Sequence, residues 1–152
     1  MADDLTPAAP AATAPTSGDE ILQVMQRMFG DEVRIGITVI VNGAVMTGTL
    51  APMHEYLEAL SEQFATGLSP TIAQAEGRRV FRDAFGVDEA KRAHEQAKDA
   101  GAPLRTFRYL HLVNARVMSG TSLVPTGDRG VPVRIRVDHI SAWSLGALQD
   151  AS

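Results

Sequence analysis

The stretch ITVIVNGAVMTGTLAP, residues 37–52, decides the fold expected for this chain of 152 residues. Asn42-Gly43 lies between two apolar runs, and both residues tolerate the positive φ angles that a two-residue hairpin turn requires. With Val41 opposite Ala44, the apolar side chains of both runs share one face and the threonines share the other. The stretch therefore predicts a β-hairpin with one buried face. Gly48 belongs to the apolar face, where its missing side chain predicts the close approach of a covering helix.

Most of this phrase returns as VNARVMSGT at residues 113–121, which shares six of nine positions with residues 41–49. Pairing across Asn114-Ala115 predicts a second hairpin with Leu112 opposite Val117. Alanine replaces glycine poorly in such a turn, so a simple bend of the chain at this point is the alternative. The similarity of the two phrases fits either duplication or two strands that meet the same packing demands. The predicted structural hairpin residues are Asn42, Gly43, Gly48, Asn114 and Gly120.

Helical periodicity surrounds the first hairpin. Residues 17–30 begin with Ser17 and Glu20 at capping-box spacing. Their apolar positions recur as in an amphipathic helix: Ile21, Val24, Met25, Met28 and Phe29. After the hairpin, a helical insertion over about residues 52–101 is expected, with helices near 52–67, 70–85 and 88–101.

Each helix of the insertion has its own expected contacts. The first carries an apolar stripe of Met53, Tyr56, Leu57, Leu60 and Phe64. The second is anchored by Ile72, Val80, Phe81 and Phe85. The third is capped by Asp88, ends at Gly101 and is mostly polar, so it is predicted to be a solvated surface helix or a contact element of an oligomer.

The closing stretch VPVRIRVDHISAWSLG, residues 131–146, alternates with the period of a strand. Val133, Ile135 and Val137 are predicted to point inward, while Arg134, Arg136 and Asp138 point outward. Together these patterns predict an α+β fold: an antiparallel sheet of five to six strands built on hairpins, with an N-terminal helix and a two- to three-helix insertion covering one face. The alternative is an Sm-like small barrel with a helical insertion. We expect a disordered Ala/Pro-rich tail over residues 1–18 and one α+β domain over residues 19–148.

Composition excludes several classes of function. The chain has no cysteine, which excludes disulfides and thiolate metal sites and predicts a cytoplasmic protein. It has no apolar run of about 18 residues and no signal-peptide pattern, so no membrane association is expected. Its four histidines lack ligand spacing, and neither a nucleophile elbow nor a phosphate-binding loop occurs. The sequence therefore predicts no catalytic residue, no metal site, no cofactor and no enzymatic activity.

Charge is divided unevenly along the chain. Residues 1–66 hold nine acids and two bases, whereas residues 67–152 hold nine acids and twelve bases. We interpret this layout as an uneven but solvated surface, and salt-sensitive association between copies is the alternative. The acidic net charge and scarce aromatics argue against a nucleic-acid partner. Glu55, Glu58 and Glu62 are predicted to form a solvated helix stripe, and the candidate partner contacts are Glu55, Glu58, Glu62, Arg134 and Arg136.

Three segments in the same order carry a family resemblance. ITVIVNGAVMTGTLAPMHEYLEALSEQFATG (37–67), YLHLVNARVMSG (109–120) and VRIRVDHISAWSLG (133–146) resemble the gas vesicle accessory protein U family (GvpU-like). The resemblance implies a non-enzymatic, cytoplasmic protein without a cofactor that acts in gas vesicle assembly or clustering. Its implied partners are the vesicle shell, other accessory proteins and further copies of itself in a homo-oligomer. An Sm-like RNA-binding domain and a generic oligomerisation or scaffold domain are the alternatives.

Overall fold

The computed structural model describes residues 21–22, 24–25, 33–67, 74–101, 108–126 and 129–149. Several predictions concern residues outside this part and stay predictions. They are the disordered tail of residues 1–18, the capping pair Ser17 and Glu20, and the apolar positions Met28, Phe29 and Ile72.

The first hairpin has the predicted register. Strand β1 (Gly36–Val41) pairs antiparallel with β2 (Ala44–Leu50), with Val41 opposite Ala44 and Ile37 opposite Gly48. Asn42 and Gly43 have φ angles of 50° and 84°, as a two-residue turn requires. Ile37 and Val39 are fully buried, so the alternation of apolar and polar residues does set the buried face.

The predicted second hairpin at Asn114-Ala115 is wrong. The segment is one continuous strand, β3 (Tyr109–Ser119), and its hairpin turn lies at Gly120-Thr121, before β4 (Ser122–Val124). Asn114 still adopts the positive φ angle of its counterpart Asn42, at 52°. Here that angle belongs to a β-bulge, because Asn114 and Ala115 together lie opposite Gly48 of β2. The same phrase thus produces a turn in one place and a bulge in the other.

Glycines flank this bulge on both sides. A Cβ on Gly48 would lie 3.1 Å from the Cα of Ala115 and 3.2 Å from the carbonyl oxygen of Val113. The prediction that Gly48 makes room for a helix is therefore wrong, since the close neighbour is strand β3. On the other side, a Cβ on Gly130 would lie 2.3 Å from the carbonyl carbon of Asn114. The bulge therefore leaves no room for a Cβ at Gly130 and only a tight space for one at Gly48.

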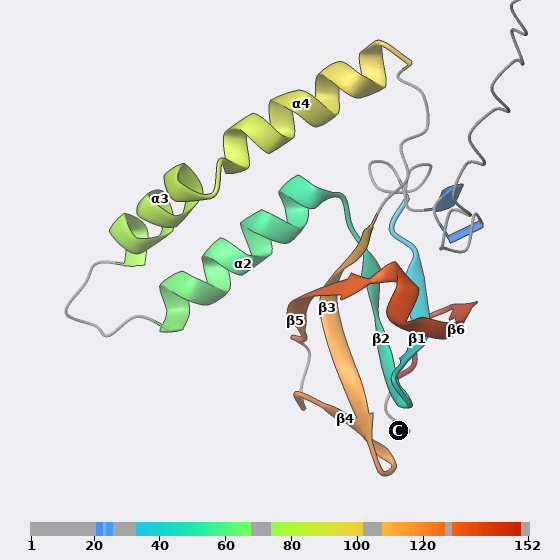
Figure 1. Ribbon diagram of the computed structural model, residues 1–152. Coiled ribbons are helices and arrows are strands. Elements are labelled where there is room, and N and C mark those ends of the chain that lie inside the picture. Colours follow the sequence, from blue (N-terminus) through green and yellow to red (C-terminus); the bar gives the residue numbers. More distant parts are fainter. Residues whose placement is uncertain are drawn as a thin grey trace, which may run out of the picture.

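The sheet is strongly curled. Its strand order is β4-β3-β2-β1-β6, and β5 (Val131–Arg136) also pairs with β3. Only the 3₁₀ turn η1 (Val137–His139) joins β5 to β6 (Ile140–Leu145). In a flat sheet, β5 beside β3 and β6 beside β1 would lie roughly 19 Å apart. The chain from Arg136 to Ile140 spans at most about 14 Å even when extended, so the sheet has to curl to bring the two strands together. The α+β fold with six antiparallel strands is confirmed, and its curled sheet has the outline of a partly open small barrel (Figure 1).

The concave face of this sheet holds the main core. Helical residues Leu22 and Met25 cover it. Met25 is buried as predicted, but Leu22 was not predicted, and the predicted Ile21 and Val24 are exposed. The closing segment contributes Ile135 and Val137, both 5% exposed, so the predicted inward face of the last strands is confirmed. The buried residues of the main core are Leu22, Met25, Ile37, Val39, Leu50, Leu110, Leu112, Ala115, Ile135 and Val137.

Helices α2 (Met53–Gly67), α3 (Gln74–Ala84) and α4 (Val87–Asp99) form the insertion between β2 and β3, and we call them the helical arm. Figure 1 shows the arm extending away from the sheet. Its α2 packs against β3 and β5 on the face opposite the core, where the Tyr56 and His111 rings lie 5.0 Å apart.

Several details of the arm differ from the sequence-based expectations. Met53 and Phe64, at the two ends of the predicted apolar stripe of α2, are exposed. Val80 and Phe85, predicted anchors, are exposed, whereas Phe81 is buried as predicted. The cap of α4 is Gly86 in a left-handed conformation instead of Asp88, which lies in the first turn. The helix ends as predicted, with Gly101 at a φ angle of 55°.

The polar face of the first hairpin is held by the chain after β6. The hydroxyl of Thr47 donates to the carbonyl of Ile37 at 3.3 Å and accepts the backbone N–H of Leu148 at 2.9 Å. The hydroxyl of Thr38 donates to the carbonyl of Gly146 at 2.8 Å. These bonds fasten residues 146–148 across β1 and β2.

Replacing Thr47 by valine is expected to lower the free energy of unfolding by about 1–2 kcal/mol. The side chain keeps its shape, but the N–H of Leu148 loses a buried acceptor. Urea denaturation of Thr47→Val and Thr49→Val measures the difference, because Thr49 lies on the same strand and is only half-buried. Equal stability of the two variants would contradict the assigned role of the Thr47 hydroxyl.

Candidate functional site

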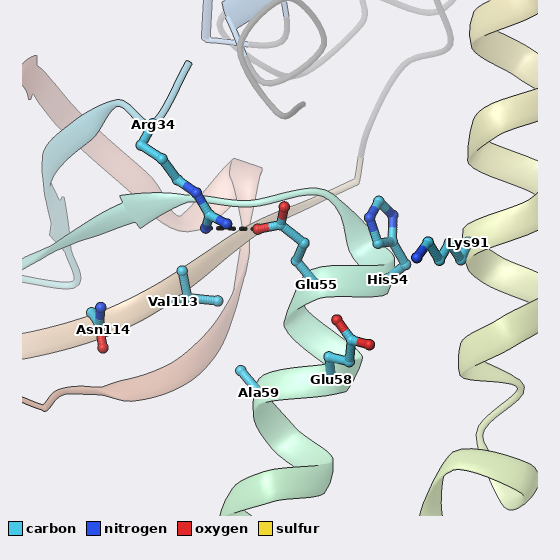
Figure 2. A pocket seen from close by; sticks show the side chains of 8 residues that line it. All are labelled: Arg34, His54, Glu55, Glu58, Ala59, Lys91, Val113 and Asn114. Carbon is cyan, nitrogen blue, oxygen red and sulfur yellow. Dashed lines mark ion pairs between the residues drawn. The ribbon is translucent and has the colours of Figure 1, made fainter. Parts of the chain in front are cut away.

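A polar cleft of about 480 Å³ lies between the sheet and the helical arm. Its lining comes from four segments: the chain before β1, α2, α4 and the bulge of β3. The lining residues are Arg34, His54, Glu55, Glu58, Ala59, Lys91, Val113 and Asn114 (Figure 2). Two of the predicted partner contacts, Glu55 and Glu58, are therefore brought together here.

An ion pair spans the entrance of the cleft. Arg34 lies 2.8 Å from the carboxylate of Glu55, whose side chain is 21% exposed. Figure 2 shows the Arg34 side chain reaching across from the chain before β1 to α2, while Lys91 points in from α4. The cleft thus combines both signs of charge and remains open to solvent, which suits contact with a polar partner surface.

His54 of the cleft lining also contacts a second histidine, which is not part of that lining. His54 of α2 and His94 of α4 lie with their ring centroids 4.9 Å apart. No group of three or more His, Cys, Asp or Glu side chains is placed for metal binding in the described residues. This pair is therefore a contact between two helices of the arm.

The predicted solvated stripe of glutamates is a set of ion pairs. Glu62 accepts two hydrogen bonds from Arg78, at 2.7 and 2.9 Å. Glu58 pairs with Arg82, which also pairs with Asp88, and these hydrogen bonds raise the pKa of Arg82. Glu58 and Glu62 therefore fasten α2 to α3, and the sequence alone missed this because their partners lie 24 and 16 residues away, respectively.

The two predicted arginine contacts lie on β5, apart from the cleft lining. Arg136 donates two hydrogen bonds to the carboxylate of Asp138, and this hydrogen bonding lowers the pKa of Asp138. Arg134 lies 3.8 Å above the ring of Tyr109 and is exposed. In the described part of the chain, Arg134 forms no ion pair with a carboxylate, in contrast to Arg136.

His111 is a residue that the sequence only placed within an apolar strand. It is 6% exposed and lies beneath Tyr56 of α2. Burial lowers its pKa to about 4, and the neighbouring Arg134 adds to this effect. The imidazole is therefore neutral at pH 7 and packs as part of the contact between α2 and the sheet.

These features define an α+β domain whose curled sheet carries a projecting helical arm and an open, charged cleft. The described residues contain no helix long and apolar enough to span a membrane. A family model described as gas vesicle protein GvpU-like matches residues 19–148. The chain therefore belongs to the GvpU-like family of gas vesicle proteins, as its sequence resemblance implied. No curated protein and no solved structure shows significant similarity to the chain.

Proposed function

We propose that this protein acts without catalysis in gas vesicle assembly or clustering, through self-association and contact with the vesicle shell or other accessory proteins. The family match over residues 19–148 is the observation that carries the proposal. The same match supports a place on the gas vesicle in the cytoplasm. The open cleft and the exposed arginine of β5 supply polar surfaces for such contacts.

Arg134 is the proposed shell contact among the five residues considered. The other four, Glu55, Glu58, Glu62 and Arg136, already form ion pairs within the chain. The guanidinium carbon of Arg134 lies 3.8 Å from the centre of the Tyr109 ring, and the side chain is exposed on β5. An exposed guanidinium group can bind a carboxylate of a partner in a two-pronged manner.

Replacing Arg134 by glutamine is expected to weaken co-flotation with isolated gas vesicles by roughly tenfold, the effect of about 1.4 kcal/mol. The matched control is Arg92→Gln, which removes one positive charge from an exposed ion pair within α4. Co-flotation and vesicle clustering would be measured at several salt concentrations, and salt should weaken both. If wild-type protein neither binds nor clusters vesicles at any salt concentration, the proposed function is wrong. Equal binding of Arg134→Gln and wild type would exclude Arg134 as the contact.

RNA binding by an Sm-like barrel is the rival function. The curled sheet and the short η1 connection favour the barrel outline, but a fold alone does not establish an activity. A gel shift with short single-stranded RNA separates the two proposals. A tight, salt-sensitive complex with RNA, without vesicle binding, would replace the gas vesicle proposal.

A further inference from the structure

Three phenylalanine rings form a row on the helical arm. Phe64 of α2 and Phe81 of α3 have ring centroids 5.3 Å apart, and Phe81 stacks on Phe85 at 4.2 Å. The middle ring is 7% exposed, whereas Phe64 and Phe85 are 46% and 57% exposed. Since a covered aromatic ring removes a large apolar area from water, the two outer rings leave much of this stabilisation unused. We call these three residues the aromatic row.

The arm has little core of its own to explain such exposed rings. Its buried residues in the described part are Leu57, Ser61, Ala65, Gly77, Phe81 and Val87. Half of these have small side chains. Phe64 lies eleven residues along α2 from Met53, which places it roughly 16 Å from the end of the helix that follows β2. The row therefore belongs to the projecting part of the arm (Figure 1).

The charges around the row are neutralised within the chain. Every charged residue of α3 takes part in an ion pair: Arg79 with Glu76 and Asp83, Arg78 with Glu62, and Arg82 with Glu58 and Asp88. In a contact around a two-fold axis, identical surfaces meet each other. In such a contact, an unpaired charge beside the row would face the same charge of the other copy and be repelled. Charges that are paired within each copy avoid this repulsion. A strongly charged partner would find little to recognise on the same surface.

We propose that two copies of this chain associate through the aromatic row, arm against arm, around a two-fold axis. This inference rests on the self-association proposed above and assigns it to a surface. Each copy covers the exposed faces of Phe64 and Phe85 with the same rings of the other copy. Because apolar contact drives this association, salt should affect it little. Association driven by the uneven charge of the chain would instead weaken with salt.

The first test is the full chain with Phe64→Ser and Phe85→Ser together, studied by sedimentation equilibrium at low and high salt. Wild type should dimerise at both salt concentrations, and the variant should bind itself at least tenfold more weakly. The matched control is Leu145→Ser on β6, which removes an apolar side chain that is 59% exposed and far along the chain from the arm. A wild-type monomer, an association abolished by salt, or equal loss in the control would overturn the arm contact.

A second measurement does not depend on how well the double variant folds. The chain has no cysteine, so a single Ala84→Cys beside Phe85 gives a unique thiol on the exposed end of α3. A short bis-maleimide should cross-link this variant into a dimer and leave Ala142→Cys, on exposed β6, as a monomer. If the Ala84→Cys protein sediments like the wild type but is not cross-linked, the proposal is wrong.

Vesicle binding, measured beside these experiments, keeps the two proposals distinguishable. Vesicle binding by a wild-type monomer would overturn the arm contact and leave the gas vesicle function standing. A wild-type dimer without any vesicle binding would support the arm contact and reject that function. If the wild type is a monomer and the double variant Phe64→Ser and Phe85→Ser loses vesicle binding, the aromatic row contacts the shell instead of a second copy.

Discussion

Replacing Gly130 by alanine is expected to destabilise the protein by about 3 kcal/mol, at the upper end of what overpacking costs. A Cβ on Gly130 would lie 2.3 and 2.4 Å from the carbonyl carbon and oxygen of Asn114, and 2.5 Å from the carbonyl oxygen of Ala115. These neighbours are backbone atoms of the β3 bulge, so no side-chain rotation relieves the contact. The bulge has to shift, and with it the pairing of β3 with β5.

Two glycine variants complete this experiment. A Cβ on Gly48 would lie 3.1 Å or more from its neighbours, so Gly48→Ala should cost less than Gly130→Ala. Gly67, the last residue of α2, has no atom within 4 Å of the Cβ position, and Gly67→Ala should leave stability unchanged or raise it slightly. Thermal and urea denaturation of the three variants should give this order. A Gly130→Ala protein as stable as Gly67→Ala would contradict the packing of the bulge.

Lowering the pH from 6.5 to 4 is expected to remove up to about 3 kcal/mol of stability through His111. Burial against Tyr56, with Arg134 opposite on β5, lowers the pKa of His111 in the folded protein to about 4 from 6.5. Between these values the unfolded chain binds a proton that the folded protein excludes. The contribution of His111 to the free energy of unfolding is therefore fully present above pH 6.5. It falls as the pH decreases from 6.5 to 4 and stays constant below pH 4.

The matched variant is His111→Phe, which keeps an aromatic ring beneath Tyr56 and removes the titrating group. Urea denaturation of both proteins between pH 4 and 8 gives the difference in their free energies of unfolding. That difference should be constant above pH 6.5 and move in favour of His111→Phe as the pH decreases towards 4. A difference independent of pH would show that the imidazole is not excluded from protonation in the folded protein.

The sequence predicted local structure well where two residues decide it. Asn42-Gly43 fixed the first hairpin because both of its angles require residues that tolerate positive φ. The alternation of Val133, Ile135 and Val137 gave the buried face of the closing segment for a similarly local reason.

Distant contacts decided the features that the sequence missed. The phrase around Asn114 resembles the first turn, but it forms a bulge where β3 pairs with β2, with Gly48 of β2 and Gly130, just before β5, lying close against it. Likewise, Glu58 and Glu62 acquire arginine partners only when α3 folds back on α2. For the same reason His111 gave no sign that a tyrosine of another helix would cover it.

The pairing of β6 with β1 has a consequence for the order of synthesis. Thr38 and Gly146, which bond to each other, are 108 positions apart along the chain. A ribosome therefore releases the first hairpin and the whole helical arm well before the strand that completes the sheet. Until then the apolar side of β1 lacks Ile140 and Trp143, which pack against the finished core. One edge of β1 therefore stays without its partner strand until β6 has been made, and the sheet closes only after the whole helical arm has been synthesised.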